Sequence, residues 1–346
     1  MTGLGEVLET ARRASGLTQA QLAEMAEMSQ AELSRFENEI REPKAEQLDR
    51  LARSLGVTAH LLQHAGRARG SMAMDAHMRR RQTAGPGVWR RVEARLNLYR
   101  WHTSHLFEEV TMNAEHSVPT MDLLDVFPED AARMVRAQWR MPAGPVRRLV
   151  AWLEAAGCVV IAEDFGSSRV DGVSQWVGDH PVIMFNTVMP PDRVRLTLAH
   201  ELGHLVLNSD ALGVDDVEAQ ANAFAGEFLM PSEFVRPLLR NVKPARLLDL
   251  KVEYGVSMQA LVERAFHLGL LSAAQRTSMY KMLSARGWRR HEPRSGDIPV
   301  EQPTLPAVIA ERLAARGLSP DEVATIAGFA GASHNQLFRV PGLRAV

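Results

Sequence analysis

The stretch Thr197–Asp210, TLAHELGHLVLNSD, decides which fold and chemistry the middle of this 346-residue chain has. Most of it is apolar, as expected for a helix that is buried on nearly every side. Yet His200, Glu201 and His204 stand in its middle, with Gly203 beside them. Burying such polar groups without partners costs on the order of a few kcal/mol, and a glycine weakens a helix by about 1 kcal/mol relative to alanine. The pattern therefore indicates a functional site.

The polar residues of this stretch spell HELGH, from His200 to His204. Two histidines four residues apart project from one face of a helix, so both imidazoles can bind a single tetrahedral Zn²⁺. Glu201 can contact a water on that metal without being a ligand, and it can act as the general base. The alternative is a pair of core histidines hydrogen-bonded to backbone, with Glu201 facing solvent. The apolar surroundings favour zinc, because a metal compensates directly for the burial.

A catalytic zinc site also needs a third protein ligand and one open position. The downstream carboxylates that could supply this ligand are Asp210, Asp215, Asp216, Glu218 and Glu227. The aspartates fall in an expected loop over 208–216, whereas Glu218 lies on the next expected helix, on one face with Asn222. Glu227 is nine residues further on, roughly half a turn out of phase, and is expected to face solvent or to pair with a base. We therefore predict Glu218 as the third ligand.

Three short segments before the motif predict a small sheet. They are rich in β-branched residues and are separated by Gly, Ser and Asp. Their sequences are CVVIAEDF over 158–165, VDGVSQWV over 170–177 and HPVIMFN over 180–186. Gly203 lacks a side chain, so we expect a neighbouring element, the second helix or the sheet, to approach the motif helix closely there.

Two consecutive segments, RVRLTLAHELGHLVLN and VEAQANAFAGEFLMP, resemble the ImmA/IrrE family of zinc metallopeptidases. In that family a helix with HExxH precedes a helix of the form E-x-x-A-N-x-F-A-x-E-x-L-M-P, and the likeness extends over roughly residues 138–290. The resemblance implies that His200, His204 and Glu218 bind Zn²⁺ and that Glu201 is the catalytic base. It also implies the substrate, because members of the family cleave helix-turn-helix repressors to release stress or mobile-element genes.

Within such a fold, one strand is expected to lie beside the cleft and to offer an exposed edge. An extended peptide can bind such an edge by strand addition. The expected substrate strand consists of Val182, Ile183, Met184, Phe185 and Asn186. No residue that stabilises the oxyanion is assigned; His180 and His267 are candidates, and each also has a structural explanation.

The N-terminal part predicts short helices separated by tight breaks, with Thr18 and Ser29 as N-caps and Glu32 completing a capping box. The stretch GLTQAQLAEMAEMSQAELSRFENEIREPKAEQLDRLARSLGV resembles the helix-turn-helix of the Cro/CI-type (XRE) repressors. In that arrangement the early residues of the recognition helix face the major groove and Gln19 touches phosphate. The predicted groove-facing residues are Ser29, Gln30, Ser34 and Arg35.

The charge of this module does not by itself favour DNA. Residues 1–66 contain seven Lys and Arg against ten Asp and Glu, whereas residues 67–101 contain nine arginines against two acids. The second segment can be a basic arm that adds phosphate contacts. Alternatively it is a solvated linker, or it pairs with the acidic module. The helix-turn-helix could then serve dimerisation or the recognition of a similar repressor domain.

The composition indicates a globular protein of the cytoplasm. The formal net charge is −1, and no apolar run approaches the roughly 18 residues that span a bilayer. The single cysteine, Cys158, excludes an intramolecular disulfide, fits a reducing compartment and is expected to pack as a small core residue. The first residues are amphipathic and charged, without the apolar region of a signal peptide.

We therefore expect a multidomain, mostly α protein whose peptidase domain is of the α+β, zincin-like type. The expected segments are a helix-turn-helix domain at 1–66, a basic linker and helix at 67–118, the metallopeptidase domain at 119–235, its helical extension at 236–292, a linker at 293–306 and a small helical segment at 307–346. The predicted function is a zinc endopeptidase and DNA-binding regulator with a protein substrate and double-stranded DNA as partners, no membrane partner, and a homodimer as a compatible assembly. The alternative is a non-proteolytic transcriptional regulator with a structural or sensory zinc site.

Overall fold

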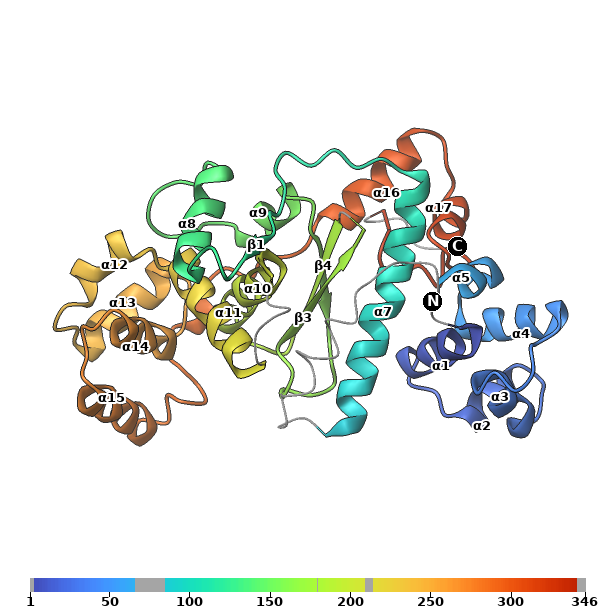
Figure 1. The fold of residues 1–346 in the computed structure, drawn as a ribbon, viewed down its shortest axis with the longest axis horizontal. Coiled ribbons are helices and arrows are strands. Elements are labelled where there is room, and N and C mark those ends of the chain that lie inside the picture. Colours follow the sequence, from blue (N-terminus) through green and yellow to red (C-terminus); the bar gives the residue numbers. More distant parts are fainter. Residues whose placement is uncertain (1–2, 66–84, 179, 209–213, 341–346) are drawn as a thin grey trace.

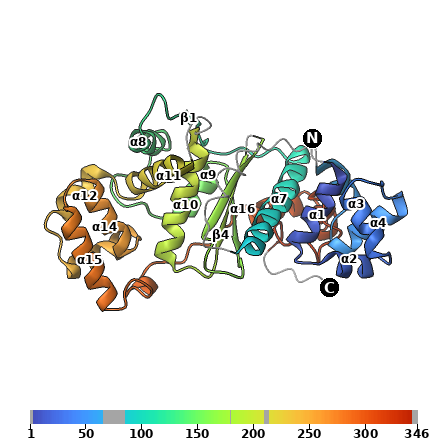
Figure 2. The same cartoon turned by 60° about the horizontal axis from the view of Figure 1, so that its bottom comes forward.

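The computed structural model describes residues 3–65, 85–178, 180–208 and 214–340. It is mostly helical, with a three-stranded sheet near its middle, as the sequence predicts (Figure 1). The N-terminal helices lie on the right of this view, followed by the long helix α7 (Pro86–Glu109), the sheet, and the helices α10 (Pro191–Val206) and α11 (Val214–Leu229). The same order is visible after rotation (Figure 2). Across the described ranges, no helix combines the length and apolarity that crossing a membrane requires.

Helix N-caps and a buried ion pair stabilise the N-terminal bundle. Its helices are α1 (Leu4–Ala14), α2 (Gln19–Met25), α3 (Gln30–Glu37), α4 (Ala45–Leu55) and α5 (Ala59–His64). Thr18 caps α2 in a full capping box, and Ser29 caps α3 by accepting from the backbone N–H of Glu32. The Glu32 side chain instead accepts from Gln47. The Arg12 guanidinium donates to buried Glu37 at 2.6 Å and so joins α1 to α3.

Helix α7 connects this bundle to the sheet, and it is the helix expected within residues 67–118. Trp101 packs into the apolar core of the bundle. Val92 and Leu96 pack on the sheet, with Val173 among their partners in the same cluster. Because α7 contributes to both cores, it holds the bundle against the rest of the protein.

The sheet contains the three predicted strands, β2 (Val159–Glu163), β3 (Gly172–Val177) and β4 (His180–Asn186). Their order is β2-β4-β3; β2 pairs with β4 in parallel and β3 pairs with it antiparallel. A separate parallel pair joins β1 (Met121–Asp122) to β5 (Leu207–Asn208). Cys158, just before β2, is fully buried, as expected of a core residue, and burial raises the pKa of its thiol.

The prediction that Val182–Asn186 offers an exposed edge is wrong. This segment belongs to β4, the middle strand, whose backbone is paired on both sides: Val182 lies opposite Val159 in β2 and opposite Gln175 in β3. The run Val182, Ile183, Met184, Phe185, Asn186 is also buried throughout. A continuous apolar run is typical of a strand covered on both faces. The edges of this sheet belong to β2 and β3.

Helices α10 and α11 pack closely through the glycine of the motif. A Cβ atom added at Gly203 would lie 3.2 Å from the Cα and O atoms of Ala221 and 3.2 Å from Cδ1 of Phe224. The second helix is therefore the element that approaches Gly203. The two helices are therefore close together at this point. The polar residues of α11 consequently lie opposite those of α10.

The remaining helices surround this pair and then return to the N-terminal bundle. They are α8 (Pro128–Gln138), α9 (Leu149–Ala155), α12 (Ser232–Leu239), α13 (Pro244–Tyr254), α14 (Met258–His267), α15 (Ala273–Ala285), the 3₁₀ helix η2 (Ser295–Asp297), α16 (Leu305–Ala315) and α17 (Pro320–Ile326). The segment expected as a linker over 293–306 is held in place, because Glu301 pairs with Arg195 of α10 and Thr304 bonds to Glu154 of α9. After α17, the carbonyl of Gly328 accepts from Thr58 at 2.9 Å.

Candidate metal centre

The two motif histidines lie one turn apart on α10 and face each other. Their rings are 4.6 Å apart at an interplanar angle of 88°, and their Nε2 atoms are 3.0 Å apart. His200 is buried and His204 is nearly so, with side-chain exposures of 6% and 12%. Two imidazole nitrogens therefore converge on one point in a largely dry part of the molecule.

Glu218 of α11 completes the cluster. Its two carboxylate oxygens lie 3.4 Å from Nε2 of His200 and 3.3 Å from Nε2 of His204. Ligand atoms at the corners of a tetrahedron around Zn²⁺, each at about 2.0–2.1 Å, are separated by about 3.3–3.4 Å. For each histidine nitrogen the nearest Glu218 oxygen lies at such a separation, and the two Nε2 atoms, 3.0 Å apart, are slightly closer, so the three side chains are arranged to surround one tetrahedral metal.

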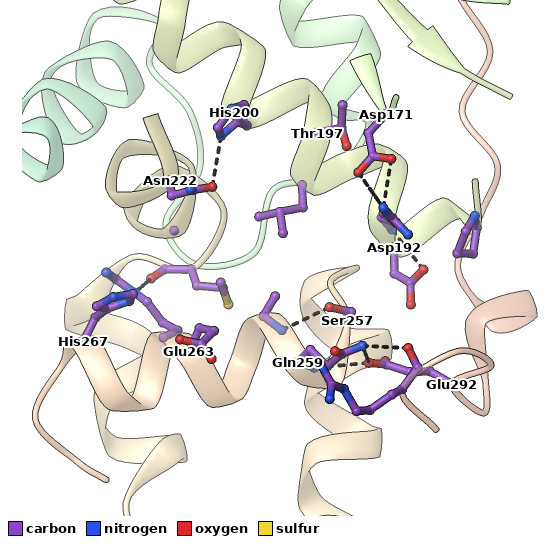
Figure 3. A pocket seen from close by; sticks show the side chains of 18 of the residues that line it. Asp171, Asp192, Thr197, His200, Asn222, Ser257, Gln259, Glu263, His267 and Glu292 are labelled. Atoms are coloured by element: carbon purple, nitrogen blue, oxygen red, sulfur yellow. Dashed lines mark hydrogen bonds and ion pairs between the residues drawn. The ribbon is translucent and has the colours of Figure 1, made fainter. Parts of the chain in front are cut away.

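Asn222 fixes the orientation of His200, a role that was not predicted from the sequence. His200 donates through Nδ1 to Oδ1 of Asn222 at 3.0 Å (Figure 3). With its proton on Nδ1, His200 presents a lone pair at Nε2 toward the other two donors. Electron pairs this close repel unless a cation or a proton lies between them, so the donor set fits a metal ion. The signal in the sequence was the spacing that places Asn222 one turn after Glu218.

The protonation of Glu218 agrees with this chemistry. Burial would raise the pKa of its carboxyl, but the hydrogen bonds and charge interactions with His200 and His204 outweigh burial and hold the pKa well below its usual range. The third donor is therefore an anion near neutral pH, as a carboxylate ligand must be.

Glu201 is 4% exposed and lies on the side of α10 that faces the sheet. Ser174 of β3 donates its hydroxyl proton to Oε2 of this carboxylate at 2.8 Å. The alternative in which Glu201 faces solvent is excluded. Ser174 carries no motif signal, and only the pairing of β3 beside α10 identifies it.

The other carboxylates considered as ligands lie elsewhere. Glu227 is buried and pairs with Arg264 and Arg133, so of the two expected environments it has the basic partner and does not face solvent. Burial raises its pKa, but Arg264, Ser232 and Arg133 together keep that pKa below its usual value. Asp216 is exposed and outside the cluster. Asp210 lies outside the described residues, as does the side chain of Asp215.

A cleft of about 740 Å³ opens beside His200 and Asn222. Residues of α10, α11 and α14 line it, as do Glu292 and Ser295. Figure 3 shows Glu292 on the opposite side of the view from His200. Of the two candidates for stabilising the oxyanion, His267 lines this cleft, whereas His180 packs its ring on Phe107 at 4.5 Å. The cleft is large enough for several peptide side chains.

The predicted groove-facing residues run along α3, from its N-cap Ser29 to Arg35 in its last turn. Ser29, Gln30 and Arg35 are exposed and Ser34 is half-buried. Gln19, at the start of α2, is half-buried, and its amide donates to Glu37 at 2.7 Å. The face is accessible, but the Gln19 side chain is already engaged.

The proposed basic arm is only partly available for phosphates. Arg95 pairs with Glu163 of the sheet and Arg100 is buried, whereas Arg90 and Arg91 are exposed. The arginines at 67, 69 and 79–81 lie outside the described residues. Of the described arginines in this segment, α7 therefore uses two for packing and leaves two exposed.

Comparisons with known proteins agree with both resemblances. Residues 153–266 match the family described as the IrrE N-terminal-like domain, and residues 8–62 match the family described as helix-turn-helix. The radiation response metalloprotease IrrE of Deinococcus radiodurans is 37% identical over 95 residues, which cover 25% of this chain and 27% of that protein. The match thus spans about a quarter of the relative's length. The chain carries an N-terminal helix-turn-helix domain and, after it, an IrrE-like metallopeptidase domain.

Proposed function

Starting from a chain that joins a helix-turn-helix domain to an IrrE-like metallopeptidase domain, we propose a zinc-dependent endopeptidase that also acts as a DNA-binding regulator. One observation carries the proposal: His200, His204 and Glu218 converge within hydrogen-bond range of one another. The buried carboxylate of Glu201 follows directly after the first of these ligands. Three ligands leave one position open in a tetrahedral site, as in catalytic zinc sites.

Each side chain has a distinct task in this mechanism. Zinc held by the three ligands would supply Lewis acidity, which polarises a peptide carbonyl and lowers the pKa of water. Glu201 takes the proton from the attacking water and then delivers it to the leaving amine. Asn222 keeps the His200 ring in the tautomer that presents Nε2 to the ligand cluster.

The peptide would bind along β3 rather than β4. Among the described strands β3 pairs only with β4, so its second edge can accept an extended chain. Ser174 of this strand contacts Glu201, so a peptide bound there would lie near the general base. We propose a helix-turn-helix repressor as the substrate, as the family resemblance implies, and the cytoplasm as the location.

Co-expression with candidate repressors tests the peptidase function. Wild-type protein should cleave its repressor, whereas Glu201→Gln should retain zinc and leave the repressor intact. Equal cleavage by both proteins would refute the assigned mechanism. Asp216→Asn, which changes an exposed carboxylate on α11, is the matched control and should cleave like wild type.

The exposed face of α3 supports DNA binding as a second activity. Arg35 can contact base edges or phosphate, so Arg35→Ala should weaken operator binding by about tenfold. Arg53→Ala, at an exposed position on α4, is the control. A homodimer would place two such faces on a palindromic operator.

The alternative is a regulator whose zinc is structural or sensory. Metal analysis and an operator shift assay on His200→Ala separate the alternatives. Loss of zinc with DNA binding retained would mean that the two modules act separately. Loss of both would favour a zinc site that serves the regulator.

A further inference from the structure

Strand β3 lies along α10 in a fixed register. Its even-numbered residues face the helix: a Cβ atom added at Gly172 would lie 2.5 Å from Cγ2 of Thr197, and the indole N–H of Trp176 donates to the carbonyl of Leu205 at 3.2 Å. Between these two contacts, Ser174 meets Glu201. Three successive positions of one strand face therefore contact three successive turns of the helix.

The spacing of the two elements explains this register. Two residues of a strand advance by about 6.6–6.8 Å, and four residues of a helix advance by about 6.0 Å. Thr197, Glu201 and Leu205 are four residues apart, so they keep step with alternate residues of β3. The outer contacts of the series hold the strand, and Ser174 is consequently held opposite Glu201.

The hydroxyl of Ser174 contacts the carboxylate on one side only. It donates to Oε2 at 2.8 Å and lies 3.3 Å from the Glu201 carbonyl oxygen. Among the described residues, no other side chain is hydrogen-bonded to the Glu201 carboxylate. Oε1 is therefore left to accept a proton, while Oε2 is anchored.

We infer that Ser174 is a positioning residue that holds the Glu201 carboxylate in the orientation required of the general base. A glutamate side chain has several rotamers, and a catalytic group has to be held close to its productive geometry by its supporting residues. The inference rests on the proposed function for its catalytic meaning. The contact itself links the general base directly to the strand whose free edge is available to a peptide.

The variants Ser174→Thr and Ser174→Val test this inference with matched shapes. Both side chains are β-branched and suit a strand, but only threonine retains the hydroxyl. Zinc content and the thermal unfolding midpoint establish that both variants fold. Trp176→Phe removes a different hydrogen bond between β3 and α10 and measures the cost of loosening the strand.

Acetohydroxamate provides a readout that does not require a known substrate. It binds zinc through its oxygens, and its hydroxyl can donate to the neighbouring carboxylate. We expect Ser174→Val to weaken its binding by about tenfold relative to Ser174→Thr, because a charge-assisted hydrogen bond is lost. In the Glu201→Gln background the same pair should differ less than about twofold, because coupling requires both partners. Equal ratios in the two backgrounds would overturn the inference.

Cleavage kinetics provide the second readout. Ser174→Val should lower kcat by about tenfold with little change in KM, Ser174→Thr should restore kcat, and Trp176→Phe should lower it less. A change in KM alone would assign Ser174 to peptide binding and contradict the positioning role. If the wild type cleaves no repressor, the proposed function fails, whereas the acetohydroxamate comparison still decides the role of Ser174.

Discussion

His102 of α7 and His200 of α10 are both buried histidines, yet they have different surroundings. His102 bonds through Nδ1 to the carbonyl of Ala327 at 2.7 Å and stacks on Phe329, and its Nε2 has no hydrogen-bond partner among the described residues. His200 bonds through Nδ1 to Asn222, and its Nε2 faces two further donor atoms. Burial and an anchored Nδ1 are common to both. Only the convergence of donors at Nε2 distinguishes the candidate metal centre from the other buried histidine.

The largest expected effect comes from removing one of the converging donors. Glu218→Gln replaces an anionic ligand by a neutral amide, so zinc affinity should fall by at least about a hundredfold. Equilibrium dialysis against a zinc buffer measures this change. Asp216→Asn should bind zinc like wild type. Full zinc affinity in Glu218→Gln would mean that convergence does not identify the ligands.

The second carboxylate of α11 should behave in the opposite way. Glu227 is buried against Arg264 and Arg133, so Glu227→Gln leaves buried positive charge without its partner. Breaking a buried ion pair by changing one member costs about 3–5 kcal/mol. Urea unfolding of the zinc-free proteins should show this loss, whereas zinc affinity per folded molecule should be retained. A loss of zinc affinity without a loss of stability would reverse the two assignments.

His102, the buried histidine outside the candidate metal centre, should make the free energy of unfolding depend on pH. Burial lowers the pKa of His102 to about 3, whereas the unfolded chain takes up this proton near pH 6.5. Folded protein therefore loses stability as pH falls below about 6.5, by about 2 kcal/mol between pH 7 and pH 5. His102→Gln cannot titrate, so its unfolding free energy should approach or exceed that of wild type as the pH falls. If the unfolding free energies of the two proteins changed with pH in parallel, this account would be contradicted.

The smallest expected effect comes from altering the close contact between α10 and α11 at Gly203. Gly203→Ala gains about 1 kcal/mol of helix propensity, but its new methyl group meets Ala221 and Phe224 at 3.2 Å. Overpacking of this kind costs about 1–3 kcal/mol, so a net loss of about 1 kcal/mol is expected. Zinc affinity should also weaken, because Glu218 is displaced with α11. Higher stability and unchanged zinc affinity would show that the approach tolerates a side chain.

The convergence of the three candidate ligands could be predicted from sequence because helical spacing determines which side chains share a face. That reasoning placed His200, His204 and Glu218 together and separated Glu227 from them. The strands were also predictable from composition. Strand order was not, because the segments themselves do not specify which strand pairs on both sides; the edge was therefore assigned to Val182–Asn186 instead of β3.

Contacts between segments that are distant in the sequence could not be predicted either, for the same reason. Ser174 stands in an unremarkable strand, and its partner lies 27 residues further along the chain. The segment around Glu301 reads as a proline-rich spacer, yet it pairs with Arg195 of the motif helix, 106 residues earlier. Neither contact produces a periodic pattern in the sequence, so neither can be predicted without the three-dimensional fold.

The most direct test of the central claim combines metal analysis with cleavage of a helix-turn-helix repressor by wild type and Glu201→Gln. We predict one bound zinc per chain in both proteins, with cleavage slower by about 10²–10⁴-fold in the variant, because only the general base has been removed. Cleavage by Glu201→Gln at the wild-type rate, or wild-type cleavage that persists when the protein contains no metal, would contradict the account.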